Sequence, residues 1–385
     1  MLSYFSQKEG QISSKTPYGN NQEVGKYIQS DDAKIYYEIY GQGKPLVAIH
    51  GGGGLGCPYE IGRFIDYFKT RFQVIVVTSR AHGKSEIGHS KVSLEQKASD
   101  VYNIIKKETK EKVILFGFSD GGYTSLELAF LHPEIVSKVI SIGTGTIKPG
   151  LISPDFKIDY IEKEDKRFYD QQLKLMPEPN RWQEFLNNYM KYFSELTFGK
   201  EIFSNIKCKV LLISGENDDH APLDTVIEAY KMLQNKSLCI VPSAGHCCFI
   251  DNYEVVFSAI ESFLREDLKE ISRETILQTS KSWDGTDLPD YLKGKPEIIV
   301  HRYTIPPKMK LKSHHHEHMS FAVVVKGKLT VVKKDGTEKT FSEGESMAEL
   351  VNVIHYGVNK GDVPVDLIVF NNAKEGMQLS FIADE

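Results

Sequence analysis

The sequence predicts two domains of different class: an α/β domain with a mostly parallel sheet, and a following all-β domain that forms a small barrel or sandwich. From about residue 26, short apolar runs alternate with longer amphipathic segments, which is typical of a parallel sheet covered by helices. Between about residues 148 and 206 an aromatic and charged insert interrupts this alternation and predicts a small helical cap over the sheet or, alternatively, a surface excursion. After about residue 270 only short strand-like pieces remain, separated by turns. A length of 385 residues leaves room for two to three domains.

The elements of the first domain follow in order. Residues 1–25 are polar and lack the apolar core of a signal peptide, so they are expected to form a polar N-terminal tail. Residues 94–108 and 253–265 have helical spacing. The α/β domain is therefore expected at 26–270, with its cap at about 148–206. The runs that predict buried strands are Leu46–Ile49, Val74–Val77, Val113–Phe116, Val139–Ile142, Val210–Ile213 and Leu238–Val241.

The second domain is expected at residues 283–385, after a linker at 271–282. Its first residues, 283–296, are rich in turn formers. Valine-rich pieces follow, separated by Gly, Asp-Gly and Pro turns, and show no helical period. The predicted strands are Ile298–Ile305, Phe321–Val325, Lys328–Lys333 and Val365–Phe370.

Composition narrows the range of partners. The formal charge is −5 and no basic block occurs, so nucleic acid is not an expected partner. No apolar stretch approaches the ~18 residues of a membrane span. The odd number of cysteines, five, forms no disulfide framework, which favours free thiols in packing roles and a cytoplasmic protein. A small molecule is the expected substrate.

Ser119 stands in Gly117-Phe118-Ser119-Asp120-Gly121, between a predicted strand and a predicted helix. A phosphate-binding loop would need a lysine after the glycines, and none follows here. The G-x-S-x-G pattern at a strand-to-helix turn instead exposes a serine hydroxyl at the edge of a sheet. A serine needs a base and an acid to become a nucleophile.

An acid and a histidine follow Ser119 in the required order, each just after a predicted strand. Gly215-Glu216-Asn217-Asp218-Asp219-His220-Ala221-Pro222 supplies Asp218, with Asp219 as the less favoured neighbour. Pro242-Ser243-Ala244-Gly245-His246 supplies His246, and His220 is the alternative base. The sequence therefore predicts a catalytic triad of Ser119, His246 and Asp218.

The triad chemistry also needs donors for a developing oxyanion. His50-Gly51-Gly52-Gly53-Gly54 follows the first buried strand, and the expected donors are the backbone N–H groups of Gly52 and Asp120. The Asp120 side chain either favours the helix N-terminus or recognises a cationic group of the substrate. Four cap aromatics either shape an acyl pocket or simply pack the lid: Trp182, Phe185, Tyr189 and Tyr192.

Together these motifs resemble the α/β-hydrolase fold superfamily over residues 26–267. The family's G-x-x-D-x-x-x-P pattern places the acid at Asp218, and Thr78–Ser85 resembles its D-x-R-G-x-G-x-S loop, with Thr78 for Asp and Ala81 for Gly. The resemblance implies a serine hydrolase that needs no cofactor and acts on a small ester, lactone or related acyl compound. Hydrolysis of a C–C bond and perhydrolysis are the alternatives on this fold.

A histidine cluster precedes a strand of the second domain. Alternate residues of a strand share a face, so His314 and His316, or His316 and His318, can ligate one ion. Residues 344–359 resemble the second motif of the cupin superfamily, G-x5-P-x-G-x2-H-x3-N, with Leu350 for Pro and Asn352 for Gly. The first motif is matched by His314, His316 and Gly327, but its glutamate position falls near Met319 or Ser320.

This second resemblance covers residues 283–385 and implies a metal held by His314, His316 and His355, with Glu349 or His318 completing the ligand set. Nitrogen-rich ligation suits Zn, Fe, Ni or Cu. The cupin domain would then be a metal-dependent enzyme, a ligand-sensing module or an oligomerisation element. Cupins often pair through their sheets, so a homodimer is expected.

Overall fold

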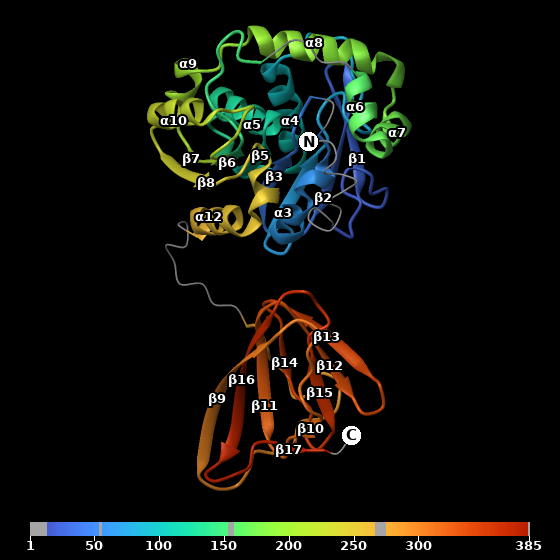
Figure 1. Cartoon of the computed structure of the whole chain (residues 1–385), viewed down its shortest axis with the longest axis vertical. Helices are drawn as coiled ribbons and strands as arrows, with labels where there is room; N and C mark the ends of the chain where they lie inside the picture. Colours follow the sequence, from blue (N-terminus) through green and yellow to red (C-terminus); the bar gives the residue numbers. More distant parts are fainter. Residues whose placement is uncertain (1–13, 54–55, 153–157, 266–274, 384–385) are drawn as a thin grey trace. The chain divides into compact units, whose positions relative to one another are not determined.

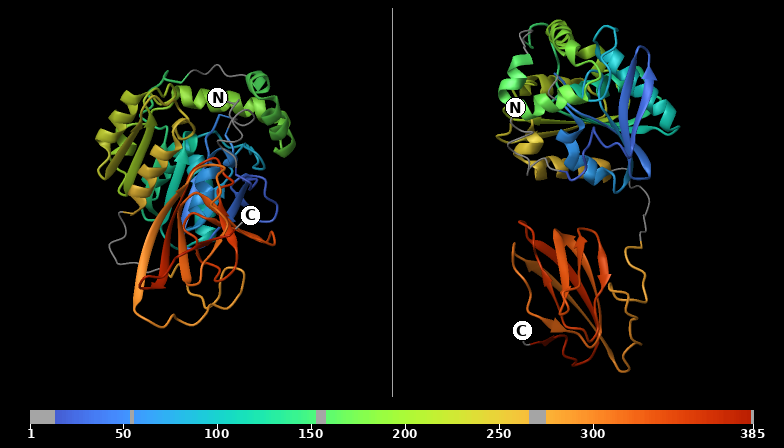
Figure 2. Two further views of the ribbon diagram at one scale, coloured as in Figure 1. Left: turned by 60° about the horizontal axis from the view of Figure 1, so that its bottom comes forward. Right: turned by 90° about the vertical axis from the view of Figure 1, so that its right-hand side faces the viewer.

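The computed structural model describes residues 14–53, 56–152, 158–265 and 275–383, and the chain divides into two compact units, Met1–Lys269 and Glu270–Glu385. The first unit is an α/β domain and the second consists of antiparallel sheets (Figures 1 and 2). The predicted fold class is confirmed. None of the described helices is long and apolar enough to cross a membrane.

The first unit is built on an eight-stranded sheet with the order β1-β2-β4-β3-β5-β6-β7-β8. β1 (Gly25–Ser30) and β2 (Ala33–Tyr40) form an antiparallel hairpin, which the sequence pattern did not predict. The other six strands are parallel, and each contains one of the predicted apolar runs. They are β3 (Lys44–Ile49), β4 (Phe72–Val77), β5 (Val113–Phe118), β6 (Val136–Ile142), β7 (Lys209–Gly215) and β8 (Lys236–Val241).

Both faces of the central strands, β3 to β7, are buried, because helices cover each face of the sheet. Alternate residues of β3 enter different cores: Leu46 packs with α3 (Gly62–Phe68) and α12 (Tyr253–Arg265), whereas Val47 packs on the opposite face. That opposite face is covered by α4 (Leu94–Glu108), α5 (Asp120–Leu131) and α10 (Leu223–Met232). Burial on both faces explains why these strands are continuous apolar runs.

A helical cap is inserted between β6 and β7, inside the range that the sequence predicts. It lies over the carboxyl ends of the strands in Figure 1. Its elements are α6 (Ile158–Glu164), α7 (Lys166–Leu175), α8 (Trp182–Glu195) and the short α9 (Lys200–Phe203).

The N-terminal residues differ from the polar tail expected at 1–25, of which residues 1–13 lie outside the described part. Tyr18 is 3% exposed and belongs to the core beside α3. The buried carboxylate of Glu38 accepts hydrogen bonds from the backbone N–H groups of Gly19 (3.0 Å) and Asn21 (2.8 Å). One buried acid on β2 therefore fastens this segment to the sheet.

The second unit has two antiparallel sheets, ordered β13-β12-β15-β10-β17 and β14-β11-β16-β9. Inward-facing residues such as Ala322, Leu329, Phe341 and Leu367 form its core. The four predicted strands lie in β9, β11, β12 and β16, and the shorter strands were not predicted. The bounds are β9 (Pro296–Ile305), β10 (His314–His315), β11 (Met319–Lys326), β12 (Lys328–Lys333), β13 (Glu338–Ser342), β14 (Ser346–Ala348), β15 (His355–Val358), β16 (Val365–Lys374) and β17 (Phe381–Ile382).

The stretch expected as a linker, 271–282, is partly attached to the second unit. Residues 271–274 lie outside the described residues. Ser282 donates its hydroxyl to the backbone carbonyl of Glu349 at 2.8 Å, and the Ser346 hydroxyl donates to the carbonyl of Ile276. Hydrogen bonds from serine hydroxyls to backbone carbonyls leave no apolar pattern in the sequence. The composition of this stretch therefore indicates a linker.

Candidate active site and metal centre

Ser119 occupies a strained turn between β5 and α5. Its φ of 51° and ψ of −117° are unusual for a residue other than glycine, and such strain is common at nucleophiles. The flanking glycines are required by close packing. A Cβ at Gly117 would lie 2.2 Å from the carbonyl oxygen of Gly121, and a Cβ at Gly121 would lie 2.4 Å from that of Ile49. The turn therefore holds the serine in one position.

The structure brings Ser119, His246 and Asp218 together from the ends of three different strands. His246 Nε2 lies 3.0 Å from Ser119 Oγ, and His246 Nδ1 lies 2.9 Å from each carboxylate oxygen of Asp218. These distances allow the imidazole to take the serine proton while the carboxylate orients the ring. The rings of Phe118 and His220 pack against His246, at centroid distances of 5.0 and 4.7 Å.

Asp218 is buried, yet it is held as a carboxylate. Burial alone would raise its pKa. Hydrogen bonds from His246 and from the backbone N–H groups of Ala221 (2.8 Å) and His220 (2.9 Å) outweigh burial and lower the pKa of Asp218 below its usual value. Its neighbour Asp219 has a side chain that is 82% exposed. The His220 ring packs on His246 rather than taking its place between Ser119 and Asp218.

The glycine-rich loop after β3 lies against the residue that follows the nucleophile. A Cβ at Gly52 would lie 2.5 Å from Cβ of Asp120, so the backbones approach closely. Asp120 is the first residue of α5, and the first N–H groups of a helix have no partner within it. Both expected oxyanion donors, the N–H groups of Gly52 and Asp120, therefore belong to backbone segments that pack beside Ser119.

The Asp120 carboxylate has a partner that sequence reasoning missed. Lys97 of α4 places its Nζ 2.7 Å from both carboxylate oxygens, and the two side chains are 5% and 1% exposed. Asp120 is thus engaged inside the protein, contrary to the alternative that it recognises a cationic substrate group. The available signal was a lysine on the buried face of α4, between Leu94 and Val101.

Tyr189 of the cap completes this buried group. Its ring centroid lies 4.5 Å from Lys97 Nζ, and its hydroxyl interacts with the Asp120 carboxylate and with the backbone of Gly53. Burial, followed by the charge of Asp120, raises the pKa of Tyr189 well above its usual value, so the phenol is neutral. A cap residue therefore contacts both segments that carry the expected oxyanion donors.

The other cap aromatics have mainly packing contacts. Trp182 is 1% exposed and stacks on Tyr169 at a centroid distance of 5.6 Å. Phe185 packs between His82 and Tyr189. The Tyr192 hydroxyl accepts a hydrogen bond from the backbone N–H of Leu94 at 3.0 Å, which ties α8 to α4.

The buried side chain of Glu60 contacts the glycine-rich loop that begins at Gly51 and contains the expected oxyanion donor Gly52. Its Oε1 accepts a hydrogen bond from the backbone N–H of Gly51, and burial raises the pKa of its carboxyl to about 8. The folded protein therefore keeps a proton on Glu60 that the unfolded chain releases near the ordinary glutamate pKa of 4.5. Sequence reasoning did not single out Glu60, because its partner is a backbone group nine residues away.

We expect Glu60 to make the protein less stable as the pH rises. Its contribution is fully present below the unfolded pKa of 4.5 and is lost as the pH approaches its folded pKa of about 8. Glu60→Gln keeps the neutral form, so the free energy of unfolding of this variant, relative to wild type, should increase with pH across that window. Urea unfolding at a series of pH values measures this. Glu127→Gln is the matched control, because the pKa of Glu127 is raised only to about 7. The pH range over which its free energy of unfolding changes relative to wild type should therefore end at a lower pH than for Glu60→Gln. A difference that stays constant with pH would contradict the expectation.

Three histidines meet in the second unit. His314 pairs directly with His355 across β10 and β15, and the ligating atoms of His314, His316 and His355 lie within 4.8 Å of one another. Each Nδ1 lies 2.7 to 2.8 Å from a backbone carbonyl oxygen, of Lys312, Leu379 and Val353 respectively. A carbonyl only accepts, so each Nδ1 carries the proton and each Nε2 keeps a lone pair for a metal.

Glu349 adds a carboxylate to this group. Its Oε2 lies 3.1 Å from His316 Nε2, yet that nitrogen is buried and makes no hydrogen bond of good geometry within the described part of the chain. Burial alone would raise the pKa of Glu349, but the neighbouring imidazoles, His316 first, lower it to about 2. His318 is not part of the three-histidine group; its ring packs on His316 at a centroid distance of 5.6 Å, and its Nε2 lies 3.0 Å from the side-chain oxygen of Asn371. The donor set thus suits a divalent transition metal.

Comparison with known proteins agrees with the two folds. Residues 44–180 match the family model of the alpha/beta hydrolase fold, and residues 301–371 match that of the cupin domain. A 2-hydroxy-6-oxo-6-(2'-aminophenyl)hexa-2,4-dienoic acid hydrolase of Metapseudomonas resinovorans is 22% identical, with 67% of this chain and 95% of that protein covered. A 2-hydroxy-6-oxo-6-phenylhexa-2,4-dienoate hydrolase of Comamonas testosteroni is 26% identical, with 59% and 91% covered.

Solved structures resemble the first unit. A serine hydrolase involved in carbazole degradation superposes with a TM-score of 0.54 at 20% identity, covering 63% of this chain and 99% of that one. The enol-lactonase from Burkholderia xenovorans superposes with a TM-score of 0.52 at 18% identity, covering 62% and 99%. At these identities the likeness shows the shared fold.

Proposed function

We propose that this chain, an α/β hydrolase joined to a cupin domain, is a serine hydrolase that cleaves a small ester, lactone or related acyl compound. The observation that carries the proposal is the continuous hydrogen-bonded chain from Ser119 Oγ through His246 to Asp218. Ser119 Oγ attacks the substrate carbonyl while His246 Nε2 accepts its proton. Asp218 stabilises the imidazolium, and the N–H groups of Gly52 and Asp120 bind the oxyanion.

The acyl-enzyme then reacts with water. His246 first gives its proton to the leaving group, and afterwards takes one from the attacking water. The leaving group departs as an alcohol, or stays attached to the acyl chain when the substrate is a lactone. No cofactor takes part in these steps.

Hydrolysis of a C–C bond is the second candidate. The relatives named above act on 6-oxo-hexadienoates, and hydrolysis at such a ketone breaks a C–C bond. The same triad serves both reactions, and the difference is that the leaving carbon must be protonated. Parallel assays with a phenyl ester and a 6-oxo-hexadienoate separate the two candidates.

Labelling by a fluorophosphonate tests the nucleophile without knowledge of the substrate. We expect one adduct on the wild-type protein, seen as a single mass increase of the intact chain, and none on Ser119→Ala. Ser125→Ala is a matched control, because Ser125 is buried on the same helix and donates its hydroxyl to the carbonyl of Gly121. Failure of the folded wild-type protein to react, or labelling of Ser119→Ala, would contradict the proposal.

We further propose that the cupin domain binds one divalent transition metal, of the Zn, Fe, Ni or Cu group, through His314, His316, His355 and Glu349. The support is the group of ligating atoms of His314, His316 and His355, which lie within 4.8 Å of one another, with Glu349 Oε2 3.1 Å from His316 Nε2. A bound metal supplies a Lewis acid in the cupin domain. The protein's part is to orient the imidazoles through the carbonyls of Lys312, Leu379 and Val353.

Metal content measures this second proposal directly. We expect about one equivalent of metal per chain by mass spectrometry of the purified protein, in line with one three-histidine group. His355→Ala should contain less metal, because one of the four proposed ligands is removed. His315→Ala is the matched control: its ring stacks on Phe381, and the residue is outside the group. Equal metal content in all three proteins would contradict the proposal.

A further inference from the structure

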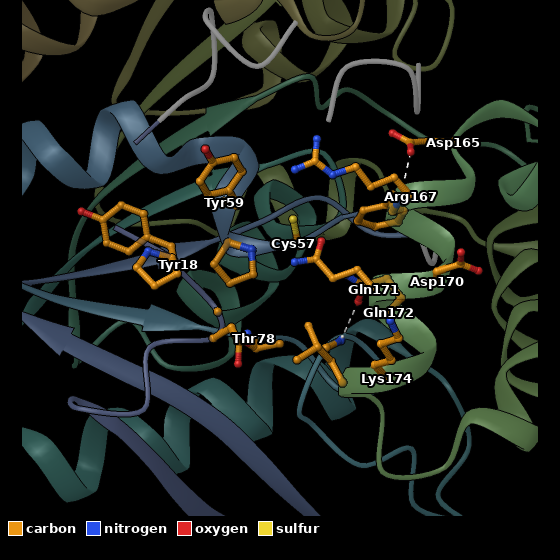
Figure 3. Close-up of a pocket in the computed structure, with 17 residues that line it drawn as sticks. Tyr18, Cys57, Tyr59, Thr78, Asp165, Arg167, Asp170, Gln171, Gln172 and Lys174 are labelled. Atoms are coloured by element: carbon orange, nitrogen blue, oxygen red, sulfur yellow. Dashed lines mark hydrogen bonds between the residues drawn. The ribbon is translucent and has the colours of Figure 1, made fainter. Parts of the chain in front are cut away.

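A cavity and an apolar sheet face lie outside the triad and the histidine group. The cavity, of about 800 Å³, lies between α7 of the cap and the sheet domain (Figure 3). Two polar side chains of its wall already bind backbone groups of the protein. Asp165 accepts a hydrogen bond from the N–H of Phe168 at 2.9 Å, and Gln172 accepts one from the N–H of Gly83 at 3.2 Å. The apolar face belongs to the cupin domain, and several of its side chains are open to solvent.

The apolar face is the outer side of the sheet β14-β11-β16-β9, in which β9, β16 and β11 lie side by side (Figure 1). The residues of these strands that form the core alternate with residues that point outward. The strand register places Val300, Phe370 and Phe321 in one row across β9, β16 and β11, and Ala348 continues the row on β14. An unbroken apolar row therefore crosses the outer side of the sheet.

The outward side chains are most exposed on β9 and β16. Ile298, Val300 and Phe370 are 62%, 52% and 42% exposed, and Ile368 and Val323 beside them are half-buried. Single exposed apolar side chains are common on protein surfaces, whereas a contiguous group of them marks a contact surface. We refer to this group as the outer apolar face, and its members are Ile298, Val300, Phe321, Val323, Ile368 and Phe370.

The size of the outer apolar face suits an interface with another protein. β9 and β16 contain ten residues each, and β11 contains eight. With a rise of about 3.3 Å per residue and about 4.8 Å between strands, the three strands cover about 450 Å² in outline. Side chains roughen this surface, so two such faces in contact would bury about 1,000 Å² or more of accessible surface, the size at which a specific interface begins.

Charges at the two ends of the face are arranged so that the face complements itself. Asp366 and Lys374 point outward from β16, and Phe370 lies midway between them. On the neighbouring β11 the signs are reversed: Lys326 pairs in register with Asp366, and the exposed Glu317 lies just before the other end of the strand. None of these four charged side chains forms an ion pair within the described residues. A second copy turned end to end would bring opposite charges together at both ends.

We propose that the outer apolar face of the cupin domain is the interface of a homodimer, packed against the same face of a second copy about a two-fold axis through Phe370. This axis sets the two β16 strands antiparallel, so Val300 and Phe370 pack on the same residues of the partner subunit. Asp366 then faces Lys374 of the partner subunit, and the charges of β11 are matched in the same way. The proposal assigns a face to the homodimer that the sequence leads us to expect, and it depends on neither proposed activity.

Analytical ultracentrifugation of the full-length protein tests this interface. We expect the wild-type protein to form a dimer with a Kd of about 10 µM or lower. Val300→Glu and Phe370→Glu should each remain monomeric up to about 100 µM, because two like charges would be buried against each other at the axis. Met309→Glu is the matched control: Met309 is 54% exposed, and its loop pairs with β15 of the other sheet. This variant should dimerise as the wild type does.

Exchange of the end charges tests the orientation of the two copies. Asp366→Lys creates two contacts between like charges in each dimer and should raise the Kd about 10-fold or more. The double variant Asp366→Lys/Lys374→Asp restores opposite charges across the interface and should recover most of the affinity. Circular dichroism spectra like that of the wild type confirm that each variant is folded.

A wild-type protein that stays monomeric at about 100 µM would overturn the proposal. In that case the outer apolar face is open or is covered by the first unit of the same chain. A dimer that persists in both Val300→Glu and Phe370→Glu would place the interface elsewhere, as would equal dissociation of Met309→Glu. Failure of the double charge exchange to bind more tightly than Asp366→Lys would overturn the proposed two-fold axis.

Discussion

Asp218→Asn is expected to lower kcat by about 10⁴-fold, the loss that this substitution produces in a Ser-His-Asp triad. The asparagine amide can face His246 Nδ1 in two ways. It can donate an N–H to this nitrogen, or it can accept from it through an oxygen that carries no charge. In the first case the proton moves to Nε2, and His246 can no longer accept the proton of Ser119. Because Asp218 is buried and accepts three hydrogen bonds, no water can take over its role.

The rate of fluorophosphonate labelling measures this loss without a known substrate, and kcat for a chromogenic ester confirms it. Asp219→Asn is the control, since it makes the same chemical change one residue away on a side chain that is 82% exposed. It should stay within about twofold of wild type, as surface substitutions do. Equal losses for both variants would show that the acid has been assigned to the wrong residue.

Lys97→Met is expected to lower the free energy of unfolding by about 3–5 kcal/mol, because removing one partner of a buried ion pair leaves the other charge unpaired. That other charge is the Asp120 carboxylate, only 1% exposed and 2.7 Å from Lys97 Nζ. The same carboxylate belongs to the residue whose N–H is proposed to bind the oxyanion. Without the lysine, its negative charge would oppose the charge that develops in the transition state.

The double variant Lys97→Met/Asp120→Asn separates the two contributions. Both of its side chains are neutral, so it should regain most of the stability that the single variant loses. Urea unfolding of the wild type, both single variants and the double variant gives the coupling energy. If the double variant were as unstable as the sum of the two single ones, the ion pair would not be the cause.

The triad could be predicted because each member lies within a few residues after an apolar strand, and the carboxyl ends of parallel strands meet at one edge of a sheet. The roles of Lys97 and Glu60 could not be predicted. The partner of Lys97 depends on how α4 is rotated about its axis, and the partner of Glu60 depends on the path of the loop after β3. The hairpin of β1 and β2 was missed because β1 is largely exposed and polar, and because Lys34 and Glu38 interrupt the apolar residues of β2.

Two departures from the family patterns can be understood only from backbone angles. Ala81 and Asn352 replace glycines of the hydrolase and cupin motifs, and both have positive φ, 64° and 59° respectively. Asparagine adopts this conformation readily, whereas for alanine it costs about 1 kcal/mol. The glycine in each pattern thus serves a turn rather than the chemistry, which explains why the site geometry is complete without it.

The contact of Tyr189 with Gly53 and Asp120 would link any opening of the cap to the proposed oxyanion donors. Tyr189 belongs to α8 of the cap, whereas Gly53 and Asp120 belong to the sheet domain. Lifting the cap far enough to admit a reactant would therefore withdraw this hydroxyl from the loop of the oxyanion donors. A substrate could therefore not enter the site and be cleaved at the same moment. The Tyr189 hydroxyl of α8 would return to the loop of the oxyanion donors only after the cap had closed over the substrate.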